Sequence, residues 1–78
     1  MARLRLLGPA REAAGLAAAE VDGADVAAVL DAARARFGPA FAELLGRSAV
    51  WLNGSPAAAS QRVGPEDEVA VLPPVSGG

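Results

Sequence analysis

Hydrophobic and polar residues alternate at the start of the chain with the period of a β-strand. In the segment 2–7, Leu4 and Leu6 fall on one face and Arg3 and Arg5 on the other, which predicts a strand with one buried face. Gly8-Pro9 interrupts the alternation, and we interpret residues 9–15 as one helical turn or a long hairpin loop. Residues 16–21 are predicted to form a second strand, although their alanines have low strand propensity.

The next segment has the period of an amphipathic helix. Its apolar residues fall on one helical face, and they are Val26, Val29, Leu30, Ala33 and Phe37. Asp25 precedes them and is a favourable N-cap residue. Gly38-Pro39 ends the helix. A shorter helical segment is expected before Gly46 from the apolar residues that follow, which are Phe41, Leu44 and Leu45.

The second half of the chain has the pattern of short strands and turns. Residues 49–52 are predicted to form a strand, and Asn53-Gly54 is typical of a type I′ hairpin turn. The returning arm must be short or lie at an edge, because Pro56 has no backbone N–H. Residues 64–67 are predicted to form a β-turn with proline at its second position, and residues 68–72 a final strand.

These elements predict an α+β roll, in which one main helix packs across one face of a mixed sheet of four or five strands. The folded domain is expected to cover residues 1–72. Residues 73–78 are expected to form a flexible tail, because two prolines keep its start extended and two glycines loosen its end.

Composition excludes several classes of function. The chain has 78 residues and a net charge of −2, and its seven basic residues are scattered arginines, so we expect no nucleic-acid partner. It has no histidine, cysteine or tyrosine, so catalytic triads, thiol enzymes and structural zinc sites are excluded. We expect no metal site and no catalysis by this chain alone. No apolar stretch approaches 18 residues and no signal core is present, which favours a cytoplasmic protein without membrane contact.

The end of the chain offers a different kind of chemistry. A partner enzyme that activates a terminal carboxylate must bring a nucleotide phosphate close to the backbone, and glycine has no Cβ to obstruct this approach. Gly77-Gly78 meets that requirement, and the apolar residues before it offer a strip for a partner to bind. Two terminal glycines are also typical of a frayed terminus. The residues that precede them are therefore needed to distinguish between these two interpretations.

Residues 67–78 resemble the end of the small subunit of molybdopterin synthase, a family of ubiquitin-like β-grasp sulfur carriers. Three further features agree with this family. Arg11-Glu12 and then Gly15 follow the first strand, a helix follows the second strand, and the segment 50–53 is a strand ending in asparagine. The resemblance extends over the whole chain and implies the β-grasp fold.

The resemblance implies that Gly78 is adenylated by a ubiquitin-activator-like adenylyltransferase that uses ATP. A sulfur donor enzyme then converts it to a thiocarboxylate, and the large subunit of molybdopterin synthase uses this sulfur to build molybdopterin. Gly77 and Gly78 would enter the activation channel, and this chain would bind no cofactor itself. The expected partner-binding residues are Arg11, Glu12, Leu72, Pro73, Pro74, Val75 and Ser76.

Several alternatives remain open at this point. Sulfur could instead be delivered to thiazole or to transfer RNA, or the chain could be a ubiquitin-like modifier joined to lysines through Gly78. A non-covalent adaptor would make the two glycines incidental. Arg11 and Glu12 are also typical of a solvated charge pair, and we interpret Trp51 as a core or half-buried sheet residue more than as a binding anchor.

Overall fold

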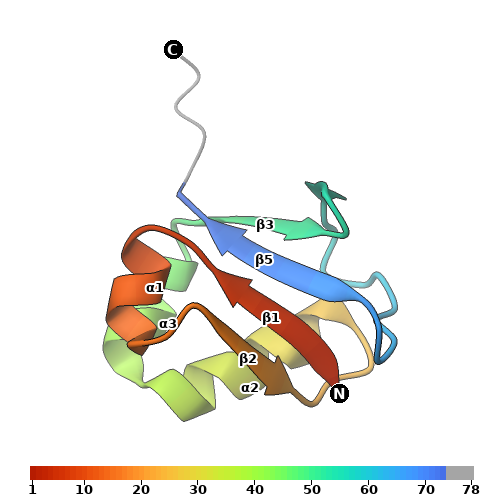
Figure 1. Ribbon diagram of the computed structural model, residues 1–78, viewed down its shortest axis with the longest axis horizontal. Helices are drawn as coiled ribbons and strands as arrows, with labels where there is room; N and C mark the ends of the chain where they lie inside the picture. Colours follow the sequence, from red (N-terminus) through yellow and green to blue (C-terminus); the bar gives the residue numbers. More distant parts are fainter. Residues whose placement is uncertain (74–78) are drawn as a thin grey trace.

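The computed structural model describes residues 1–73, and its helices cover one face of a five-stranded sheet (Figure 1). In chain order the elements are β1 (Ala2–Leu6), α1 (Pro9–Ala14), β2 (Ala18–Val21), α2 (Val26–Phe37), α3 (Pro39–Leu45), β3 (Ala49–Leu52), β4 (Ser55–Pro56) and β5 (Glu68–Leu72). The predicted α+β roll is confirmed.

The last strand in the sequence lies in the centre of the sheet. The strand order is β2-β1-β5-β3-β4. β5 runs parallel to β1 and antiparallel to β3, so the sheet is mixed, as predicted. Both β1 and β5 therefore end at the same end of the sheet, and this end holds α1 and the exit of the chain from β5 (Figure 1).

The alternation predicted for the first strand is confirmed, because the side chains of Leu4 and Leu6 are fully buried while Arg3 and Arg5 are exposed. The second strand is shorter than predicted and begins only at Ala18. The segment interpreted as a helical turn or a loop is the six-residue helix α1, with Pro9 in its first turn.

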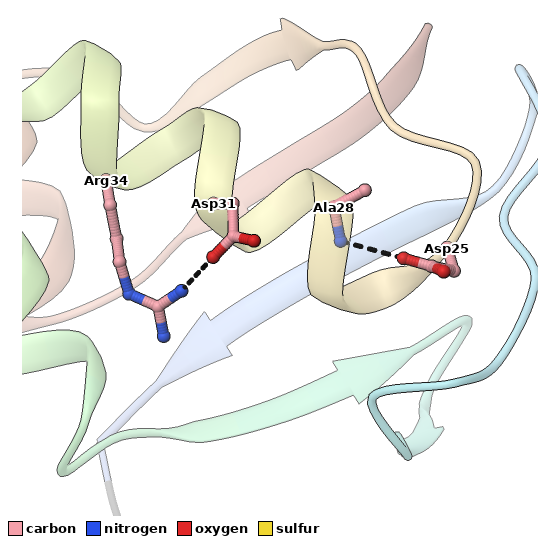
Figure 2. Close-up of polar contacts among 4 residues, drawn as sticks. All are labelled: Asp25, Ala28, Asp31 and Arg34. Atoms are coloured by element: carbon pink, nitrogen blue, oxygen red, sulfur yellow. Dashed lines mark hydrogen bonds and ion pairs between the residues drawn. The ribbon is translucent and has the colours of Figure 1, made fainter.

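α2 has the N-cap that its sequence predicts. The Asp25 carboxylate accepts a hydrogen bond of 2.8 Å from the backbone N–H of Ala28 (Figure 2). One turn later, Arg34 and Asp31 form an exposed ion pair at 2.7 Å (Figure 2). A pair of this kind contributes about 0.3–0.5 kcal/mol, so burial of the apolar face does most to stabilise this helix.

The prediction of one main helix is confirmed in the sense that α2, with 12 residues, is the longest helix of residues 1–73. α1 and α3 are also regular helices. Tertiary contacts explain the stability of these short elements. In α3 the Phe41 side chain is fully buried, and its ring meets Phe37 of α2 edge-to-face with centroids 5.1 Å apart.

A single hydrophobic core lies between the helices and the sheet. It contains Ala2, Leu4, Leu6, Ala10, Val21, Val26, Val29, Ala33, Phe41, Leu45, Val63, Val69 and Val71. The loop before α2 approaches this core closely. A Cβ at Gly23 would lie 2.6 Å from the backbone nitrogen of Val29, so this loop requires glycine.

Candidate functional site

The strand that precedes the predicted tail is held on both sides. At its end, the backbone N–H of Leu7 donates a hydrogen bond of 3.0 Å to the carbonyl of Val71, and Leu72 pairs with Ala49 of β3. Pro73 follows and is exposed. Because proline has no N–H, it cannot extend the sheet ladder as a donor. We call Leu72 and Pro73 the tail root, the place where the chain leaves a rigid sheet.

The predicted site residues divide between the described chain and its end. Leu72 is half-buried in the sheet, and Pro73 is exposed. The predictions for Pro74, Val75, Ser76, Gly77 and Gly78 fall outside the described residues. Their roles remain predictions.

Arg11 and Glu12 lie on α1, which starts three residues after β1 and occupies the same end of the sheet as the tail root (Figure 1). Both side chains belong to exposed residues. Neither forms an ion pair with another residue in the described part of the chain. They are therefore available to a partner that reaches the tail root, although the structure shows no contact that requires this role.

The sheet face opposite the helices carries an apolar band beside the tail root. In the β3–β5 ladder, Trp51 is paired with Ala70 and Ala49 with Leu72, so these four side chains share the outer face. All four residues are half-buried, which agrees with the interpretation of Trp51 as a sheet residue.

Charged side chains border this band on the β1 side. Arg5 and Glu68 approach to 4.0 Å, and both are solvent-accessible, so this ion pair adds little stability. A shallow hollow of about 290 Å³ lies farther along the sheet and does not include the tail root. Its lining residues are Arg3, Ala18, Ala19 and Glu20.

Two turns are joined at the opposite end of β5. Asn53 and Gly54 have φ values of 50° and 85°, as the predicted type I′ turn requires. The Asn53 side chain donates a hydrogen bond of 3.0 Å to the Asp67 carboxylate and accepts one of 2.9 Å from the backbone N–H of Glu68. The hairpin turn is thereby fixed to the start of β5. The dipeptide predicted the turn, but it gave no signal for this long-range contact.

Asp67 also closes the turn that precedes β5. Its backbone N–H donates to the carbonyl of Gly64 at 3.1 Å, and its carboxylate accepts a hydrogen bond of 2.7 Å from the backbone N–H of Gly64. Within residues 1–73, Asn53 is the one non-glycine residue with positive φ. Glu66 therefore does not adopt the positive φ that a type II turn needs at this position.

We expect this carboxylate to make stability depend on pH. The hydrogen bond from Gly64 and then that from Asn53 lower the pKa of Asp67 below its ordinary value, and these effects outweigh desolvation. A carboxyl group with a lowered folded-state pKa stabilises the protein above its unfolded pKa of about 4, and this contribution is lost as pH falls through the folded pKa. Urea unfolding between pH 7 and pH 2 should therefore show a smaller loss of stability on acidification for Asp67→Asn than for the parent.

Glu66→Gln removes an exposed carboxylate one residue away and is the matched control. It should retain the acid-dependent loss seen in the parent. Parallel pH profiles for the parent and Asp67→Asn would contradict the role of this hydrogen-bonded carboxylate.

Across residues 1–73 no group of three or more potential metal-ligating side chains comes together. No helix in this part of the chain has the length and apolar character needed to cross a membrane. The tail root, α1 beside it and the outer face of the sheet are the exposed features nearest to the predicted site.

Comparisons with solved structures find the same architecture elsewhere. Small archaeal modifier protein 1 from Haloferax volcanii is 32% identical, with 99% of this chain and 98% of that chain covered and a TM-score of 0.80. The protein of the same name from Methanosarcina acetivorans is 25% identical, with 99% and 95% covered and a TM-score of 0.87.

A third structure, a putative molybdopterin converting factor subunit 1 from Pyrococcus furiosus, is 19% identical. The match covers 95% of this chain and 97% of that chain with a TM-score of 0.79, and it establishes the shared fold. A comparison with curated proteins found no match. The model of the ThiS family matches residues 4–78. This match over nearly the whole length, together with the β-grasp architecture, shows that the chain belongs to the ThiS family of ubiquitin-like sulfur carriers.

Proposed function

We propose that this protein is the sulfur-carrying small subunit of molybdopterin synthase and that its Gly78 carboxylate carries the sulfur. The observation that supports this most is the family match, which extends through Gly77-Gly78. The residues before the glycines also resemble those of the molybdopterin branch of these carriers. The chain contains no cysteine, so it has no side chain that could hold sulfur as a persulfide.

The proposed chemistry takes place at the carboxyl group. A Gly78 oxygen attacks the α-phosphorus of ATP, pyrophosphate leaves, and an acyl-adenylate forms in the active site of the activating enzyme. Hydrosulfide supplied by the sulfur donor then attacks the carbonyl carbon, a C–S bond forms and AMP leaves, which produces the thiocarboxylate. Gly77 and Gly78 contribute by having no Cβ, so the backbone can approach the nucleotide closely.

The protein surface supports docking by the activating enzyme and by the large synthase subunit. The outer sheet face is free of helices, and its apolar band reaches the tail root through Leu72. A partner that covers this face can enclose the tail in the same interface, and its own side chains supply the catalytic groups. Arg11 and Glu12 are exposed on α1 at the same end of the sheet as the tail root, and they offer charged side chains to a partner that reaches this end.

Intact-protein mass spectrometry tests the proposal. Incubation with the activating enzyme, ATP and a sulfur donor should increase the mass by about 16 Da, since one oxygen of Gly78 is replaced by sulfur. A variant without Gly77 and Gly78 should stay unmodified while retaining the parent's unfolding curve. Addition of the large subunit and the molybdopterin precursor should then return the carrier to its original mass. An unmodified terminus in the complete mixture would contradict sulfur carriage.

A second candidate function has its own support. The Haloferax volcanii relative is named a modifier protein and is 32% identical to this chain. In a modifier the same acyl-adenylate leads to attack by a lysine amine of a target protein. This chain has no lysine, so it could not accept such a link on a side chain of its own. Adducts of higher mass that contain this chain in cell extracts would favour the modifier, and their absence beside a thiocarboxylate would favour the carrier.

A further inference from the structure

The loop between β1 and α1 contacts the tail root. Gly8 adopts φ 59° and ψ −133°, a conformation that is accessible almost only to glycine. A Cβ at this position would lie 2.9 Å from Cγ and 3.5 Å from Cδ of Pro73. Gly8 thus leaves the space that the proline ring occupies, although the two residues are far apart in the sequence.

Both sides of this contact are anchored. The backbone N–H of Leu7, next to Gly8, donates to the carbonyl of Val71 at 3.0 Å. Toward α1, the carbonyl of Gly8 accepts a hydrogen bond of 3.3 Å from the backbone N–H of Glu12. Leu72 is paired with β3. The loop and the end of β5 therefore form one rigid unit, with the Pro73 ring against it.

We propose that the β1–α1 loop, through Gly8, sets the direction in which the tail leaves β5, and that Gly8 is a positioning residue for the activation of Gly78. This inference rests on the proposed function. An enzyme that covers the outer sheet face and encloses the tail binds two parts of the protein, so these two parts must have a fixed orientation relative to each other. The direction of the chain at Pro73 then decides where Gly78 arrives.

The geometry of proline makes the direction at this residue matter. Its ring fixes φ, and the proline that follows restricts residue 73 to extended conformations, so a tilt at Pro73 is kept over the two prolines. Two extended residues span about 6 Å, and a tilt of about 10° at their start moves their end, from which the last residues continue, by about 1 Å. A misplacement of about 1 Å can lower a reaction rate by about a hundredfold.

The test is a double-mutant cycle in the ATP–pyrophosphate exchange reaction of the activating enzyme. The variants are Gly8→Ala, Pro73→Ala and the double variant. Gly38→Ala is the matched control, because Gly38 also has a conformation that favours glycine, φ 93° and ψ −179°, but has no atom within 4 Å of an added Cβ. Thermal unfolding of each variant identifies the temperature at which all are folded.

We expect Gly8→Ala to lower kcat about tenfold or more, with KM changed less than about threefold because the docking face is intact. The double variant should have a kcat closer to that of Pro73→Ala than to that of Gly8→Ala, since alanine at residue 73 has no Cγ to meet the new Cβ and only the backbone strain at residue 8 remains. Gly38→Ala should keep the parent kcat. A double variant as slow as Gly8→Ala, or a Gly8→Ala variant no slower than Gly38→Ala, would overturn the inference.

A second arm avoids backbone strain at Gly8. In NMR spectra of the unvaried protein, Gly8 Hα should show an NOE to the Pro73 ring, and Pro73→Ala alone should lower kcat by about threefold with unchanged KM. Absence of this NOE, or parent kcat in Pro73→Ala, would also overturn the inference. If the unvaried protein supports no ATP–pyrophosphate exchange that depends on Gly78, the proposed function fails. The NOE still decides in that case whether Gly8 contacts Pro73 in the tail root.

Discussion

A protein extended by one alanine after Gly78 should fold like the parent and lose ATP-dependent activation. The extension moves the reactive carboxylate by one residue, about 3.3 Å along an extended chain, and places a Cβ where the backbone must approach the nucleotide. We expect the rate of ATP–pyrophosphate exchange to fall by at least about a hundredfold. Circular dichroism and thermal unfolding should be unchanged, because the described core ends with β5.

The matched control adds the same alanine before Met1, whose side chain is exposed. It has the same composition as the extended variant and should retain full exchange. Normal adenylation of the protein extended after Gly78 would rule out the terminal carboxylate as the reactive group. Equal loss in both extended proteins would point instead to damage of the fold or of the docking face.

Phe41→Ala should remove a large part of the stability of the protein. Phe41 is fully buried and has the largest volume among the fully buried side chains of residues 1–73. Its truncation should cost about 3–5 kcal/mol, whereas a domain of this length has about 4–12 kcal/mol in total. Urea unfolding at 25 °C should show a free energy of unfolding lower by this amount and a midpoint at a clearly lower urea concentration than that of the parent.

Phe41→Leu is the control, since it retains most of the apolar volume and should cost about 1 kcal/mol. A variant of Leu7, whose side chain is 39% exposed, gives the baseline for loss of an apolar side chain near the surface. If Phe41→Ala cost no more than a Leu7→Ala variant, the placement of Phe41 of α3 in the hydrophobic core would be contradicted.

Local patterns in the sequence predicted most of the elements. The alternation in β1, the apolar stripe of α2 and the Asn53-Gly54 turn each depend on neighbours within a few positions, and all three are confirmed. For α1 the sequence leaves a helical turn and a hairpin loop open, because six residues are too few for a stable isolated helix. Its regular form depends on contacts with α3 and the sheet, which no local pattern encodes.

The candidate site was predicted in a different way. Gly77 and Gly78 were identified by resemblance to a family. The family match extends over these two residues, while their roles and the acceptor of sulfur remain proposals. The contacts that shape the site join distant residues, as Gly8 meets Pro73 and Asn53 meets Asp67. Such pairings follow from sheet topology, and a single sequence carries no direct signal for them.

The central position of β5 has a consequence for biosynthesis. A nascent chain that lacks residues 68–72 has no strand to join β1 to β3, so its sheet is divided and its core lacks Val69 and Val71. Since the longest-range pairing in the sheet is the last to become available, folding must wait until this strand has left the ribosome. Prematurely terminated chains that lack β5 would therefore remain unfolded and open to proteolysis. Partners that bind only the folded domain would then bind only chains in which β5, the strand that leads to the tail, has been synthesised.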